Sequence, residues 1–173
     1  CAPDTRVDIQ AEIMRWLSPQ PSNRQRIFWI TGIAGSGKST LSATLVDKLR
    51  KNHTPVAAQF FISRNIPETI DSDKIIPTIA KQLSEFSPAA ARVIYDTLKK
   101  DGFPSSREEQ VQALLLAPIR ELSKSCSMVI ILIDALDELQ NAAESVLEML
   151  SPIAPRDCDL PENVRFIITS RPE

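Results

Sequence analysis

Four short runs of apolar residues predict the buried strands of this molecule. Each run is rich in β-branched or aromatic residues and is bounded by polar or turn-forming residues, a pattern typical of strands covered on both faces. The runs lie at residues 27–31, 56–62, 128–133 and 164–169. Most of the chain between them is polar or has helical periodicity, so the apolar runs mark the layer around which the rest must pack.

The stretches between these runs carry apolar residues at helical spacing. After the first run, Leu41, Leu45, Val46 and Leu49 fall on one face, and basic residues occupy the last turn. An opening helix has a similar stripe from Ile9 to Leu17, with a capping box at Thr5 and Asp8 or an N-cap at Asp4. Further helices are expected at residues 73–86 with a restriction at Pro77, at 89–100, from Ser105 or Ser106 through a kink at Pro118, and at 144–150.

Strands that alternate with helices indicate a parallel sheet covered on both faces, in a single α/β domain. The 173 residues are enough to bury a core of this kind. The chain opens and stops abruptly, at Cys1 and Glu173, so we expect a piece excised from a larger protein.

Composition excludes several function classes. The net charge of −2 gives no basic footprint for nucleic acid. The longest apolar stretch, residues 128–133, is too short to span a bilayer, and no signal peptide is evident. Three scattered cysteines without C-x-x-C spacing favour reduced thiols in a cytoplasmic protein, with neither zinc nor a disulfide framework. The single histidine, His53, lies in a polar turn and does not indicate a nucleophilic triad.

Three of the chain's four glycines fall in one segment between the first predicted strand and helix. The segment reads Gly32-Ile33-Ala34-Gly35-Ser36-Gly37-Lys38-Ser39-Thr40 and fits the phosphate-binding pattern G-x-x-x-x-G-K-[ST]. Glycines at these positions let backbone N–H groups converge on phosphate oxygens, at a helix N-terminus that adds partial positive charge. We expect these residues to bind the phosphates, with Lys38 at the β- and γ-phosphates and the Ser39 hydroxyl on Mg²⁺.

A matching acidic group follows the third predicted strand. Asp134 ends the apolar run and would lie at the carboxyl end of the sheet, where it could hold Mg²⁺ directly or through water. Glu138 is the expected base for a water attacking the γ-phosphate, with Asp137 supporting it. The alternative is a solvated acidic turn that caps a helix at Leu139 or Asn141.

Two arginines also follow predicted strands. Arg171 could contact the γ-phosphate, and a surface arginine near a chain end is an equal alternative. Arg64 could act in the same way, but a structural salt bridge is the favoured interpretation.

These segments together resemble the NACHT domain of STAND-class signalling NTPases, in particular fungal NACHT proteins linked to heterokaryon incompatibility. The resemblance covers nearly the whole chain and is most specific at Asp134-Ala135-Leu136-Asp137-Glu138 and Thr169-Ser170-Arg171-Pro172. Further matching segments are Phe28-Trp29-Ile30, Phe60-Phe61-x-Ser63-Arg64 and Ile76-Pro77-Thr78-Ile79-Ala80-x-Gln82-Leu83.

The resemblance implies a P-loop NTPase fold, a three-layer α/β/α sandwich with four strands in the order 2-3-4-1. It also implies residue roles: Asp134 as the magnesium aspartate, Glu138 as the catalytic carboxylate, and Arg171 as a sensor of the γ-phosphate. Arg6, next to Thr5, would pass near the base and ribose. Residues 1–26 would form an N-terminal helix and linker, and residues 27–173 the P-loop core of one nucleotide-binding domain.

The leading hypothesis is a nucleotide-dependent signalling switch that hydrolyses ATP or GTP slowly with Mg²⁺ and holds ADP or GDP at rest. The resemblance adds self-association of the full-length protein, with effector and repeat domains outside this chain. Two alternatives remain: a binding-only scaffold without turnover, and a small-molecule kinase. No Asn-Lys-x-Asp string exists to read guanine, which favours ATP, but the choice of base stays open.

Overall fold

The computed structural model describes residues 7–18, 25–141, 144, 148–154 and 159–172. Its centre is a four-stranded, all-parallel sheet in the order β1-β4-β3-β2. The strands are β1 (Ile27–Thr31), β2 (Ala58–Phe61), β3 (Val129–Asp134) and β4 (Val164–Ser170). The α/β class and the expected order, read from the opposite edge, are therefore confirmed.

The strand register aligns the carboxyl ends along one edge of the sheet. Thr31 of β1 lies opposite Ser170 of β4, and Asp134 of β3 lies opposite Phe61 of β2. Because all four strands run in the same direction, the segments that follow them emerge at this edge. The glycine-rich segment, the acidic turn and Arg171 are brought together in this way.

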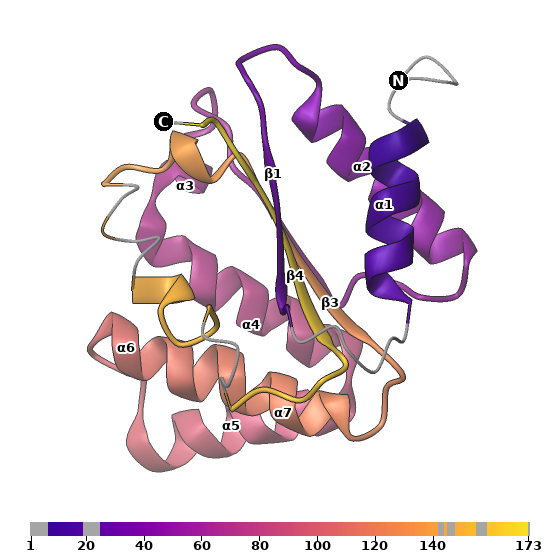
Figure 1. Cartoon of the computed structure of the whole chain (residues 1–173). Coiled ribbons are helices and arrows are strands. Elements are labelled where there is room, and N and C mark those ends of the chain that lie inside the picture. The colour runs from indigo at the N-terminus through magenta and orange to yellow at the C-terminus, as the bar shows by residue number, and fades with distance from the viewer. Residues whose placement is uncertain (1–6, 19–24, 142–143, 145–147, 155–158, 173) are drawn as a thin grey trace.

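Helices cover both faces of the sheet (Figure 1). On one face, α1 (Val7–Leu17) and α2 (Lys38–Lys51) bury Ile13 and Leu45 against Ile130 and Leu132 of β3. On the other face, α4 (Ile75–Phe86) contacts β2 and α7 (Ala117–Ser123) contacts β3, while α5 (Pro88–Asp101) packs against these two helices. The three-layer α/β/α sandwich is the result.

Shorter elements connect these layers. They are α3 (Pro67–Ile70), η1 (Ser72–Lys74), α6 (Arg107–Gln110), η2 (Val111–Leu116) and η3 (Leu136–Glu138). In the described part of the chain, no helix has both the length and the apolar character that a bilayer crossing needs.

Several local predictions need correction. The second strand is shorter than residues 56–62, because only 58–61 pair fully with β3. The kink expected at Pro118 takes the form of a π-helical segment, η2, which runs directly into α7 just before this proline. Of the two caps that the sequence left open, Ser106 is the N-cap, which confirms that alternative, and it forms a full capping box with Glu109.

The capping box expected at Thr5 and Asp8 cannot be compared, because Thr5 lies outside the described residues. The helix predicted at residues 144–150 falls partly outside them as well.

Candidate nucleotide-binding site

The glycine-rich loop joins β1 to α2. Two of its glycines have backbone conformations that are energetically unfavourable for residues with a side chain. Gly35 and Gly37 have φ angles of 71° and 80°. Gly37 is also the N-cap of α2, whose first turn it closes by accepting the Leu41 N–H at 2.9 Å. A Cβ on Gly32 would lie 2.8 Å from the Ser36 hydroxyl, so a side chain there would displace this hydroxyl. The loop is therefore built around backbone groups, as a phosphate cradle requires.

The polar side chains of the loop are arranged around the same hollow. The Lys38 ammonium donates to the carbonyl oxygens of Gly32 and, at 3.2 Å, of Ile33. The Ser36 hydroxyl is buried without a hydrogen-bond partner in the described residues. A buried hydroxyl without a partner and an ammonium at a helix N-terminus both suit an anionic ligand.

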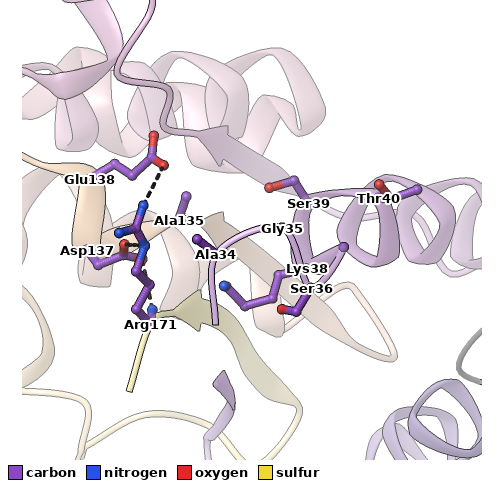
Figure 2. Close-up of a pocket in the computed structure, with 11 residues that line it drawn as sticks. Ala34, Gly35, Ser36, Lys38, Ser39, Thr40, Ala135, Asp137, Glu138 and Arg171 are labelled. Carbon is purple, nitrogen blue, oxygen red and sulfur yellow. Dashed lines mark hydrogen bonds and ion pairs between the residues drawn. The ribbon is translucent and has the colours of Figure 1, made fainter. Parts of the chain in front are cut away.

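The hollow is a pocket of about 300 Å³. Figure 2 shows the loop residues on one side of it and the acidic turn with Arg171 on the other. Most of the predicted site residues line it: Ala34, Gly35, Ser36, Gly37, Lys38, Ser39, Thr40, Asp137, Glu138 and Arg171. Gly32 contributes through its carbonyl to Lys38, and Arg6 lies outside the described residues.

Asp134, the predicted metal ligand, lies at the end of β3 and is only 1% exposed. Its Oδ1 accepts hydrogen bonds from Ser42 Oγ at 2.6 Å and Thr169 Oγ1 at 2.8 Å. Both hydroxyl residues are buried, and they come from α2 and β4, the elements on either side of the carboxylate. Sequence reasoning missed both residues, although Ser42 lies one helical turn after Ser39 and therefore on the same face.

A second pocket of about 500 Å³ adjoins the first. It shares Ser39, Ala135 and Glu138 with the first pocket and also contains Asp134. Ser39 and Asp134 therefore line a common space. This donor set fits Mg²⁺ carried by a nucleotide, because magnesium usually takes one or two protein ligands and completes its shell with phosphates and water. The described residues contain no cluster of three or more His, Cys, Asp or Glu side chains that could hold a metal alone.

The acidic turn after β3 is tied to Arg171. Ala135 adopts a left-handed conformation with φ 62°, and its N–H donates to Thr169 Oγ1 at 2.8 Å. Asp137 then accepts from the Arg171 N–H at 2.9 Å and pairs with Arg171 Nε at 3.1 Å. The Glu138 carboxylate lies 3.9 Å from Arg171 Nη2 (Figure 2). The Arg171 side chain is 26% exposed and lines the pocket, so its contact with the γ-phosphate stays a prediction that this position allows.

Arg64 contacts the site through its backbone. Its N–H donates to Glu138 Oε2 at 2.9 Å. The salt bridge predicted for its side chain is not formed with any residue in the described ranges. No signal in the sequence could have indicated this contact, because every residue except proline carries the same N–H donor.

Strand order, glycine loop and acidic turn together define a P-loop NTPase fold. The chain belongs to the family described as Nephrocystin 3, N-terminal, whose model matches residues 9–171. It is also similar to the vegetative incompatibility protein HET-E-1 of Podospora anserina, with 26% identity over 151 residues. That match covers 85% of this chain and 11% of the relative, so the chain spans about a tenth of the relative's length. The two matches confirm the resemblance to fungal NACHT-type, NLR-like proteins.

Proposed function

We propose that this chain is the nucleotide-binding and slowly hydrolysing core of an NLR-like signalling switch. The observation that carries the proposal is the meeting of the glycine loop with Asp134, Glu138 and Arg171 across two adjoining pockets. The similarity to a vegetative incompatibility protein supports a role in incompatibility signalling by a larger protein. The family resemblance adds self-association of that protein.

Each residue group has a distinct task in this proposal. The loop N–H groups and Lys38 bind the β- and γ-phosphates of ATP or GTP. Ser39 and Asp134 hold Mg²⁺, which neutralises phosphate charge when bound. Glu138 orients and deprotonates the attacking water, and Arg171 stabilises charge at the γ-phosphate. Asp137 fixes Arg171 through its backbone N–H and its guanidinium.

Calorimetric titration with ATP, ADP, GTP and GDP, with and without Mg²⁺, tests binding and identifies the base. Lys38→Ala should abolish binding, whereas Lys51→Ala, which removes an exposed lysine at the far end of α2, should leave it intact. Glu138→Gln should keep binding and stop release of inorganic phosphate, because the amide cannot accept the proton from water.

The outcomes separate the alternatives. Equal affinity in Lys38→Ala and the parent protein would remove the glycine loop from nucleotide binding. Tight, magnesium-dependent binding with no phosphate release by the parent would leave a binding-only scaffold.

A further inference from the structure

The segment between β2 and η1 forms a braced turn whose centre is Thr69. The Thr69 hydroxyl accepts the Ser63 N–H at 2.9 Å and lies within hydrogen-bond distance of the Ser63 and Ile66 carbonyl oxygens, at 3.1 and 2.9 Å. The Ile66 N–H also donates to the Ser63 carbonyl at 2.9 Å. One hydroxyl therefore joins the first, middle and last parts of the turn, so its shape is fixed by contacts rather than by chain length.

This turn touches the acidic segment after β3 at two places. Arg64, next to Ser63, directs its N–H at Glu138 Oε2 over 2.9 Å. At the other end of the turn, the Ile70 carbonyl accepts the Gln140 N–H at 3.0 Å. Glu138 makes the first of these contacts, and Gln140, which makes the second, follows it closely in the chain. The other oxygen of Glu138, Oε1, lies 3.9 Å from Arg171 Nη2. The Arg64 N–H is therefore the hydrogen-bond donor to this carboxylate, and the Arg171 guanidinium forms a longer ion pair with it.

The turn also faces the space in which the reaction would occur. Ser63, Arg64 and Asn65 line the second pocket together with Asp134 and Glu138. None of these three lines the first pocket with the glycine loop. The turn is thus placed to affect the Glu138 carboxylate. In these two pockets it shares a lining with Ser39, but not with Lys38 or residues 34–37 of the loop.

We propose that residues 63–70 form a positioning element for Glu138, with the Arg64 N–H as its contact and Thr69 as the positioning residue that fixes this N–H. The inference rests on the proposed function, in which Glu138 handles the attacking water. Its consequence is that turnover can change while nucleotide affinity stays constant, because positioning of a catalytic group is separate from phosphate binding.

Thr69→Val and Thr69→Ser form a matched pair for the test. Valine keeps the shape of threonine and removes the hydroxyl, whereas serine keeps the hydroxyl and removes a methyl group. In Thr69→Val, kcat should fall about tenfold while nucleotide affinity changes less than about twofold, since small misplacement of a catalytic group is costly. Thr69→Ser should restore kcat close to the parent value. Equal kcat in Thr69→Val and the parent, or an equal loss in both variants, would overturn the proposal.

A second measurement needs no turnover and so separates this inference from the proposed function. The amide proton of Arg64, followed by NMR in the folded protein, should move upfield in Glu138→Gln and in Thr69→Val, because a hydrogen bond to a charged carboxylate is shortened and strengthened by the charge. In Thr69→Ser it should stay near its parent position. An Arg64 amide resonance that is the same in Glu138→Gln and the parent would overturn the positioning contact. A parent protein that binds nucleotide without hydrolysis would overturn only the hydrolytic part of the proposed function.

Discussion

One strand, β4, carries an arginine near each of its ends, and the two have opposite surroundings. Arg171, just beyond the carboxyl end, meets two carboxylates at the rim of an open pocket. Arg165, near the amino end, is 3% exposed, and its Nη1 donates to the carbonyl oxygens of Glu162 and Val164. Its guanidinium lies 5.3 Å from the centre of the Trp16 ring.

The amino end of the sheet also buries a second arginine. Arg26 is 7% exposed and donates from Nη2 to the Leu160 carbonyl at 3.3 Å. Three guanidinium nitrogens of this pair, Arg26 Nε, Arg26 Nη1 and Arg165 Nε, are buried without a hydrogen-bond partner among the described residues. The pKa of Arg165 is lowered, first by burial and then by the charge of Arg26. Neither arginine forms an ion pair with a carboxylate in the described ranges.

The two ends therefore use charge differently. At the carboxyl end, an arginine and two carboxylates form ion pairs beside a pocket. These ion pairs satisfy the charges within the protein and also place them where a ligand can reach them. At the amino end, like charges are buried together, which costs stability because desolvation and repulsion act in the same direction. We expect substitutions at the carboxyl end to change nucleotide handling, and substitutions at the amino end to change stability alone.

Among the substitutions that test this comparison, Asp134→Asn should have the largest effect. The amide oxygen can still accept from Ser42 and Thr169, but the charge that attracts a cation is gone. Magnesium-dependent nucleotide affinity should fall by at least about 100-fold, because losing a metal ligand should cost more than losing a residue that only supports a ligand.

The thermal stability of the same variant should rise slightly without nucleotide, because a buried carboxylate is no longer desolvated. Calorimetric titration and thermal unfolding of the same sample measure both changes. Unchanged affinity in the presence of Mg²⁺ would contradict the assignment of Asp134.

An intermediate effect is expected from Arg171→Met. It leaves Asp137 and Glu138 as neighbouring carboxylates without their cation, so unfolding should become easier by about 1–2 kcal/mol, less than for a fully buried pair. Phosphate release should also slow, because the guanidinium is lost from the pocket. Chemical denaturation and a phosphate-release assay are the measurements, and Arg50→Met, which removes an exposed arginine, is the control. If Arg171→Met were as stable and as active as the parent protein, the proposed difference between the two ends of β4 would be wrong.

Much of this contrast could be predicted from the sequence, but not all of it. The glycine loop and Asp134 follow from local patterns, because residue type and spacing specify both backbone freedom and charge. Strand order came from the family resemblance rather than from periodicity. The contacts of Asp134 with Ser42 and Thr169 could not be predicted, since they depend on how α2 and β4 pack on either side of β3.

The buried arginines were missed for a related reason. Residues 164–169 correctly predict a buried strand, but the pattern gives no reason why a charge in that strand should stay inside. The answer lies in α1, whose Trp16 covers the Arg165 guanidinium, and that contact depends on helix packing across the sheet. The contact between the Arg64 N–H and Glu138 is harder still to predict, because a backbone donor does not require a particular residue type.

The smallest effect, and one of opposite sign, is expected from Arg165→Met. Methionine has a similar length, is apolar, and keeps a favourable contact with the Trp16 ring through its sulfur. It also removes the repulsion on Arg26 and a buried N–H group that lacks a partner. The free energy of unfolding should therefore stay unchanged or rise by about 1 kcal/mol, as when buried charges are replaced by well-packed apolar groups. Nucleotide affinity should match the parent, because Arg165 lies at the opposite end of β4 from the pockets. A loss of stability as large as in Arg171→Met would mean that the amino-end arginines stabilise the fold as well, and the two ends of the strand would no longer differ.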